Sequence, residues 1–75
     1  MKEKNNILLE FGNVIKSHRK KCGISQEELA LKAGLHRTYI GMIERGEKNL
    51  TLINIMKISS ALEIKISNLF YECNL

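Results

Sequence analysis

The sequence is poor in the residues that metal sites and enzymes use. It has no aspartate, proline or tryptophan, and its two cysteines, Cys22 and Cys73, lie far apart. Two cysteines are too few for a structural zinc site. Neither has a neighbouring histidine and acid in the sequence that would make it a nucleophile. No phosphate-binding loop, carboxylate pair or metal-ligand cluster appears. We therefore expect no enzymatic activity, no metal and no cofactor.

Long apolar runs are missing as well. No stretch approaches the ~18 apolar residues of a membrane span, and no signal peptide is recognisable. We therefore expect a cytoplasmic protein with reduced thiols and no membrane partner. The 75 residues have room for one domain. A monomer of this size buries only ~60% of the surface that its unfolded chain exposes, so a partner subunit would add stability.

What the chain does contain is an excess of positive charge. The chain has twelve lysines and arginines and eight acidic residues, all of them glutamate. This gives a net charge of +4 and a sequence pI near 9.3. The hydrophobic share of 44% is that of an ordinary globular chain, which argues against disorder. A basic balance attracts polyanions such as nucleic acid or an anionic membrane, without choosing between them.

Glycines and helix-capping residues divide the chain into five helical segments. Ser25 and Glu28 have the spacing of a capping box, and Gly34 stands where the helix that they begin must stop. Thr51 and Ser67 are the expected caps of the last two helices. The β-rich segment 64–66 has no strand to pair with and is expected to be a connector. The pattern predicts an all-α fold with helices over about 6–22, 25–33, 36–45, 51–62 and 67–71.

The segment 25–46 has the spacing of a helix-turn-helix. The small Ala30 allows close approach of the next helix, Gly34 takes the tight turn, and Leu35 fills the angle between the helices. The polar face of the second helix then stands clear of the body. Its side chains are of the types that donate to guanine edges, contact thymine methyls or bind phosphate. This face comprises His36, Arg37, Thr38, Tyr39, Met42 and Arg45.

Several segments together resemble the phage-repressor (Cro-like, XRE-type) helix-turn-helix family. They are Ser25-Gln26-Glu27-Glu28-Leu29-Ala30, Gly34-Leu35, Tyr39-Ile40, Ile43-Glu44-Arg45-Gly46 and Ala61-Leu62, and the likeness spans about residues 8–71. It implies a five-helix, lambda-repressor-like DNA-binding domain over 1–75. More narrowly, residues 35–40 and 43–51 look like the controller proteins of restriction-modification systems. Those are small stand-alone dimers that bind operators upstream of their own gene and the endonuclease gene.

The resemblance implies a role for individual residues. Gln26 matches the family's phosphate clamp, with its backbone N–H at the positive end of a helix. Arg37 matches the residue that reads guanine, a contact worth ~1–3 kcal/mol of discrimination. Thr38 and Tyr39 match neighbouring readout and backbone positions. The implied DNA-binding residues are Gln26, His36, Arg37, Thr38, Tyr39, Met42, Arg45, Lys48 and Asn49.

Two further positions carry structural expectations from the same resemblance. Arg19 and Glu44 match a partly buried ion pair that bridges the first and third helices. Glu63 stands where the family often has a glycine, which predicts slight strain at the end of the fourth helix.

Three residues outside these motifs receive expectations of their own. His18 is expected to face solvent. Cys22 is expected to pack as a small hydrophobe near the end of the first helix. Cys73 is expected to lie in a frayed tail without a role.

The C-terminal region, about residues 53–75, is more apolar than the core of one small domain needs. An exposed apolar patch usually marks an interface. We expect a two-fold homodimer that places two recognition helices ~34 Å apart on a pseudo-palindromic operator of double-stranded DNA. The expected dimer interface comprises Ile53, Ile64, Ile66, Leu69 and Phe70.

These features favour a nucleoid-associated transcriptional regulator, most specifically the controller protein of a restriction-modification system. A bound dimer near a promoter would recruit RNA polymerase or block it. Three alternatives remain at this point. A phage-type repressor shares the domain, and an antitoxin would use the apolar patch to bind a toxin. A protein-interaction module would show weak DNA affinity that does not depend on salt.

Overall fold

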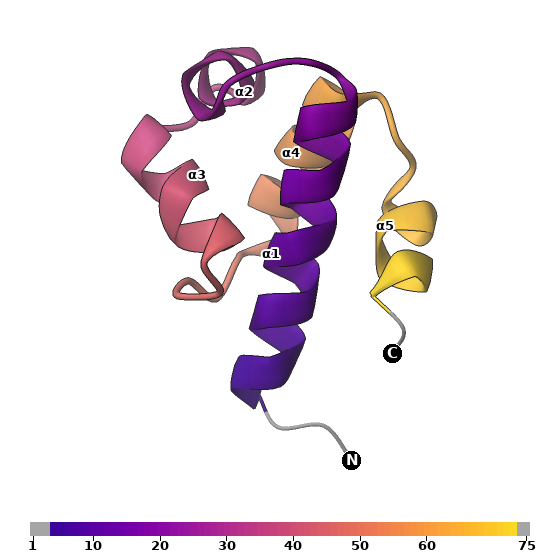
Figure 1. The fold of residues 1–75 in the computed structure, drawn as a ribbon. Coiled ribbons are helices and arrows are strands. Elements are labelled where there is room, and N and C mark those ends of the chain that lie inside the picture. The colour runs from indigo at the N-terminus through magenta and orange to yellow at the C-terminus, as the bar shows by residue number, and fades with distance from the viewer. Residues whose placement is uncertain (1–3, 74–75) are drawn as a thin grey trace.

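The computed structural model describes residues 4–73, which form five helices and no strand (Figure 1). The long α1 runs through the middle of the view, with α3 on one side of it and α5 on the other. The predicted all-α fold is confirmed, and the helix ends differ from the predicted ones by one or two residues. The bounds are α1 Lys4–Lys21, α2 Gln26–Ala33, α3 Arg37–Glu44, α4 Leu52–Leu62 and α5 Ile66–Glu72.

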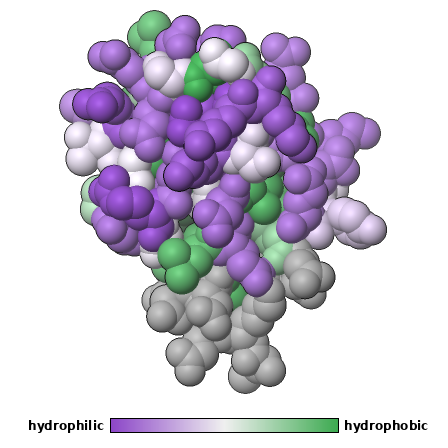
Figure 2. Space-filling model, in the orientation of Figure 1, coloured by the Kyte–Doolittle hydropathy of each residue, from purple (hydrophilic) through white to green (hydrophobic). Residues whose placement is uncertain are grey.

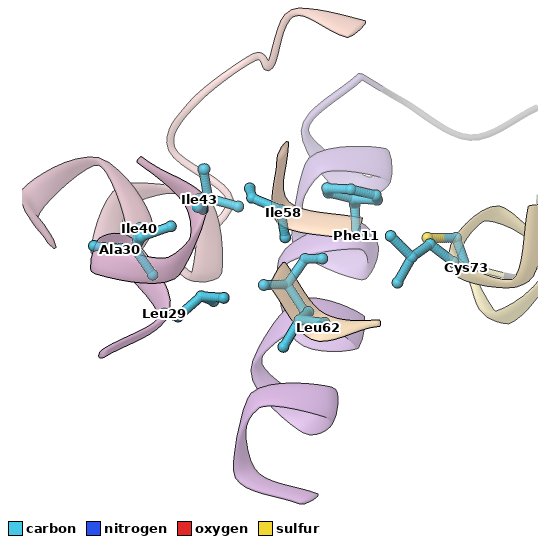
Figure 3. Close-up of a cluster of buried hydrophobic side chains, with 11 residues drawn as sticks. Phe11, Leu29, Ala30, Ile40, Ile43, Ile58, Leu62 and Cys73 are labelled. Carbon is cyan, nitrogen blue, oxygen red and sulfur yellow. The ribbon is translucent and has the colours of Figure 1, made fainter. Parts of the chain in front are cut away.

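All five helices contribute to a single apolar core (Figure 3). On α1 the buried face follows helical spacing, since Phe11 and Ile15 are four residues apart. Full burial of one large aliphatic or aromatic side chain is worth ~1.5–3 kcal/mol. The packing of these faces on one another therefore holds the short helices in place. The core residues are Phe11, Ile15, Leu29, Ala30, Ala33, Ile40, Ile43, Ile58, Leu62, Leu69 and Cys73.

The predicted capping box starts α2. The backbone N–H of Glu28 donates to Ser25 Oγ at 3.0 Å, and the N–H of Ser25 donates to Glu28 Oε1 at 2.8 Å. The bond from the backbone N–H of Ser25 is the main cause that lowers the pKa of Glu28 from its ordinary value, because it favours the charged carboxylate. Thr51 caps α4 in the same way, with its Oγ1 accepting from the N–H of Asn54 at 3.1 Å.

The end of α4 carries the strain that the sequence predicted. Glu63 has a φ of 55° and is the one non-glycine residue with positive φ in the described range 4–73. A left-handed conformation costs an L-residue roughly 1–2 kcal/mol. Ser59, which is buried, supports the turn by donating its hydroxyl to the carbonyl oxygen of Ile64.

Two expectations for the C-terminal end of the chain were wrong. The N-cap of α5 is Lys65 and not Ser67, because the carbonyl of Lys65 already accepts from the N–H groups of Asn68 and Leu69. Cys73 does not lie in a frayed tail. It is only 1% exposed, because α5 folds back on α1 and brings its C-terminal end into the core.

The expectations for the end of α1 also need correction. Cys22 is exposed and does not pack as a hydrophobe. His18 is half-buried and does not simply face solvent, since its Nε2 lies 2.9 Å from Glu72 Oε1. This contact joins α1 to α5 at the side of the molecule where the two helices meet.

Gly12 allows α1 and α3 to come into backbone contact. It is buried, and a Cβ built at this position would press into the carbonyl oxygen of Ile43 and lie 2.9 Å from that of Glu44. Because both neighbours are backbone atoms, neither can rotate away. A side chain of any size would therefore push the end of α3 off α1.

We predict that Gly12→Ala destabilises the protein by about 2–3 kcal/mol through overpacking. In a free helix the same change would add roughly 0.5–1 kcal/mol of stability. The sign of the change in the free energy of unfolding therefore tests the close contact between Gly12 and α3. Urea denaturation measures it. The exposed neighbour provides the control, because Asn13→Ala should change stability by less than about 0.5 kcal/mol. An increase in stability for Gly12→Ala would show that the close contact does not exist.

Candidate nucleic-acid interface

The two helices α2 and α3 and the turn between them form the predicted helix-turn-helix. Gly34 ends α2 with a φ of 69°, in the left-handed region that favours glycine. Leu35 is half-buried and packs against the core, which fixes the turn. His36 is the N-cap residue of α3, and its exposed side chain makes no capping bond.

One face of α3 is turned away from the core. Thr38, Met42 and Arg45 follow one another at spacings of four and three residues, so they lie along one side of the helix. Thr38 and Arg45 are exposed and Met42 is half-buried, whereas Ile40 and Ile43 point into the core. The face that the sequence assigned to base readout is thus free to meet a partner.

The start of α2 lies beside this face. Gln26, the first residue of α2, lines a shallow polar hollow together with Arg37, Thr38, Gly41 and Arg45 of the α3 region. The predicted clamp and three of the predicted DNA-binding residues, Arg37, Thr38 and Arg45, therefore border one concave surface, whereas His36, Tyr39 and Met42 do not line it. Lys48 and Asn49 are exposed in the connection between α3 and α4.

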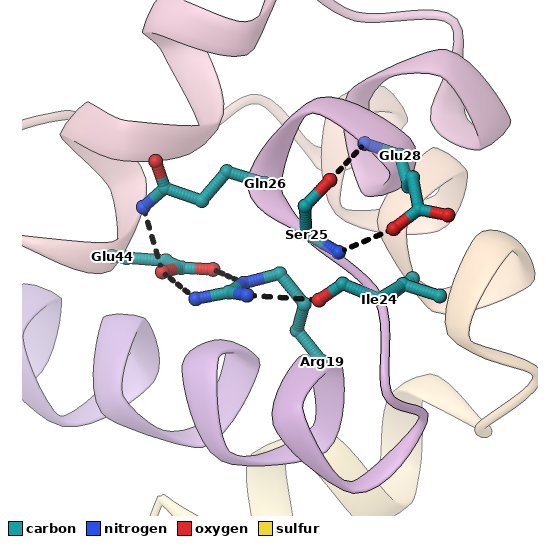
Figure 4. A network of polar contacts seen from close by, with 6 residues as sticks. All are labelled: Arg19, Ile24, Ser25, Gln26, Glu28 and Glu44. Atoms are coloured by element: carbon teal, nitrogen blue, oxygen red, sulfur yellow. Dashed lines mark hydrogen bonds and ion pairs between the residues drawn. The ribbon is translucent and has the colours of Figure 1, made fainter.

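The predicted Arg19–Glu44 ion pair is present (Figure 4). Arg19 Nε donates to Glu44 Oε2 at 2.7 Å and Nη2 donates to Oε1 at 3.1 Å, while Nη1 donates to the carbonyl oxygen of Ile24 at 2.9 Å. The Glu44 side chain is 2% exposed and that of Arg19 11%. The hydrogen bonds to Glu44 raise the pKa of Arg19 above its ordinary value. The pair joins α1 to the end of α3 and to the loop before α2.

Gln26 has a second role that the sequence did not reveal. Its Nε2 donates to Glu44 Oε1 at 3.0 Å, so Glu44 accepts bonds from both α1 and α2 (Figure 4). The side chain therefore fixes α2 against α3. The backbone N–H of Gln26 still lies at the positive end of α2, where an anion is favoured.

Two contacts at the edges of α3 were also not predicted. Tyr39 is half-buried, and its hydroxyl oxygen accepts a bond from Asn54 Nδ2 on α4 at 3.0 Å. Arg45 Nε lies 3.0 Å from Glu47 Oε2, and both side chains are more than half exposed. Glu47 raises the pKa of Arg45 above its ordinary value. Neither pair has a sequence spacing that would mark it as a contact.

The expected dimer residues are distributed over several environments. Leu69 is fully buried in the core of its own chain, so it is not available to a partner. Ile64 and Ile66 are half-buried. Phe70 is 37% exposed and lines an apolar hollow between α1, α4 and α5, whereas Ile53 is 67% exposed and lines a different groove between α2 and α4.

The rest of the surface is mainly polar. In the view of Figure 2 hydrophilic side chains cover most of the described surface, and the apolar atoms form separate spots. Within residues 4–73 no group of three or more potential metal ligands occurs. The helices in this range include none that is both long enough and apolar enough to span a bilayer.

The α2–turn–α3 unit, with its exposed polar face, is that of a helix-turn-helix DNA-binding domain. A family model described as helix-turn-helix matches residues 15–69. The chain belongs to the Cro/C1-type (XRE) helix-turn-helix family, as the sequence predicted. Members of this family are DNA-binding transcription regulators.

Within this family, the chain is similar to several control proteins of restriction-modification systems. The chain is 46% identical over 69 residues to control protein C.MunI of a Mycoplasma species, covering 91% of this chain and 93% of the relative. It is similar to the crystal structure of the restriction-modification controller protein C.AhdI from Aeromonas hydrophila, with a TM-score of 0.83, 44% identity and coverages of 84% and 96%. For the controller protein C.Esp1396I the TM-score is 0.83, the identity 38% and the coverages 91% and 87%.

We predict that Glu44→Ala unfolds the protein and does not merely weaken DNA binding. The change leaves the guanidinium of Arg19 partly buried without its partner, and breaking such a pair typically costs about 3–5 kcal/mol. Thermal denaturation followed by circular dichroism measures the effect. The control is Glu47→Ala, which breaks an exposed pair and should leave the melting temperature nearly unchanged. A normal melting curve for Glu44→Ala would count against the structural role.

Proposed function

We propose that this chain is the controller protein of a restriction-modification system. It binds a pseudo-palindromic operator as a homodimer, with α3 in the major groove. The observation that carries the proposal is the exposed side of α3, which presents Arg37 and Thr38 beside the first residue of α2. In a helix-turn-helix the N-terminal residues of the second helix contact base edges.

The similarity to the control proteins supports this assignment. C.MunI and the chain match over nearly their whole lengths. Solved structures of C.Esp1396I include variants altered at an arginine, a threonine and a tyrosine in consecutive positions. The same three residue types follow one another in this chain as Arg37, Thr38 and Tyr39.

The mechanism follows from occupancy. A dimer bound near a promoter changes the access of RNA polymerase to it, either by recruitment or by obstruction. The protein then acts in the cytoplasm, where its DNA lies. DNase footprinting on the DNA upstream of the chain's own gene tests the proposal directly. A protected region with two related half-sites is the expected result, and binding that does not distinguish this DNA from random duplex would overturn it.

The contacts divide into base readout and phosphate binding, and the two classes respond differently to mutation. Arg37→Ala should cost about 1–3 kcal/mol of operator affinity and relax discrimination at one base pair of each half-site. Lys48→Ala should weaken operator and random DNA alike and reduce the slope of log K against log salt by about 0.9. Fluorescence anisotropy titrations at several salt concentrations separate the two. Equal losses on operator and random DNA for Arg37→Ala would remove it from base readout.

The dimer interface is proposed on α5 and the connector before it, around Ile64, Ile66 and Phe70. A second copy suits this surface because α5 and α3 lie on opposite sides of α1 (Figure 1), so pairing through α5 leaves both recognition faces free. Burial of the exposed part of Phe70 would also add apolar area to a domain of marginal size. Ile53 lies in a separate groove and belongs to the proposal only if a partner reaches α4.

We predict that Ile66→Glu yields a folded monomer with weak operator binding. The half-buried side chain would place a charge in the proposed interface, where an unpaired carboxylate is strongly disfavoured. Sedimentation velocity over a concentration series gives the oligomeric state, and circular dichroism reports folding. Leu31→Glu is the matched control, because Leu31 is 83% exposed on α2 and should leave sedimentation unchanged. A wild-type chain that is monomeric at high concentration would contradict the interface.

A further inference from the structure

Tyr39 of α3 is held in place by Asn54, a residue of α4. Its hydroxyl oxygen accepts a hydrogen bond of 3.0 Å from Asn54 Nδ2. Tyr39 lies on α3 and Asn54 on the first turn of α4, so the bond links two helices that both contribute side chains to the core. Both residues are half-buried, which limits the competition of water for this bond.

The direction of this bond decides what the tyrosine can offer to a ligand. A phenolic hydroxyl has one proton and can both accept and donate. Because Asn54 supplies the donor here, the proton of Tyr39 is not used in the contact. With Asn54 as the donor, the hydroxyl of Tyr39 can still donate its proton to a ligand. A phosphate oxygen is an acceptor only, so it is the complementary partner for a hydroxyl held in this state.

We propose that Asn54 is a positioning residue for DNA binding: it orients the Tyr39 hydroxyl so that the tyrosine donates to a phosphate of the operator. The inference rests on the proposed function, because it requires α3 to lie on DNA. Asn54 itself need not touch the nucleic acid. Its effect passes through one hydroxyl group, so removing that group removes the effect as well.

The structure allows the side chain of Asn54 to be tested separately from its place in α4. The cap of α4 uses the backbone N–H of Asn54, which donates to Thr51 Oγ1. Asn54→Ala keeps that N–H and deletes only the amide that contacts Tyr39. Thr51→Ala removes the cap and keeps the amide, so it is the matched control for a general weakening of α4.

The experiment is a double-mutant cycle on the full chain, measured as affinity for the footprinted operator. Tyr39→Phe should weaken binding about 10-fold, the lower end of the contribution of a hydrogen bond to a charged group. Asn54→Ala should weaken it about 3- to 10-fold, a coupling typical of residues in direct contact. In the Tyr39→Phe background Asn54→Ala should have less than about a 1.5-fold effect, whereas the effect of Thr51→Ala should be the same in both backgrounds.

The salt dependence separates this neutral contact from an ionic one. A neutral hydroxyl releases no counterion, so Tyr39→Phe and Asn54→Ala should leave the slope of log K against log salt unchanged, unlike Lys48→Ala. If Tyr39→Phe binds as well as the wild type, or if the two losses multiply independently, the positioning role is overturned while the proposed function stands. If the wild type shows no operator preference, the proposed function fails first.

Discussion

The buried carboxylate of Glu44 is the constraint on which the recognition helix depends. Taking one charge out of water costs several kcal/mol unless its oxygens are bonded, and here they accept from Arg19 on α1 and Gln26 on α2. Gly12 lies two turns before Arg19 on α1, and it allows the carbonyls of Ile43 and Glu44 to rest on the helix backbone. One face of α1 therefore fixes the end of α3 twice, by charge and by close packing. The orientation of the exposed side of α3 follows from these two contacts.

The sequence was sufficient wherever structure depends on residues close together in the chain. Ser25 and Glu28 are three residues apart, and their capping box could be predicted from that spacing alone. The Arg19–Glu44 pair spans 25 residues and was reached only through the family resemblance. The bonds of Gln26 to Glu44 and of Asn54 to Tyr39 could not be predicted from the sequence, because they depend on how the helices pack. For the same reason the sequence predicts a tail position for Cys73, although the return of α5 onto α1 buries it.

The residues on the outer side of α3 differ in how firmly the protein holds them. Tyr39 is fixed by a neutral bond to another helix in a half-buried place. Arg45 is joined only to Glu47, and this pair is open to solvent, where ionic contacts are weak and screened by salt. On the proposed function, a phosphate would compete with Glu47 for the guanidinium of Arg45, while the position of Tyr39 would be set before DNA binds. A side chain that is already fixed, such as Tyr39, loses little conformational entropy on binding. A side chain that can move, such as Arg45, can adapt to variation in the backbone of the DNA.

On the proposed function, this arrangement also explains how a chain with a net charge of only +4 would discriminate between sites. Non-specific affinity for DNA grows with the number of cations that replace counterions. One of the cations, Arg19, is enclosed in its pair with Glu44 and contributes little to such an attraction. The non-specific electrostatic attraction to DNA is thereby smaller than the count of lysines and arginines suggests. Discrimination then depends on geometry, because the contacts of Arg37 and Tyr39 form only where base edges and phosphates lie in register with a rigidly held α3.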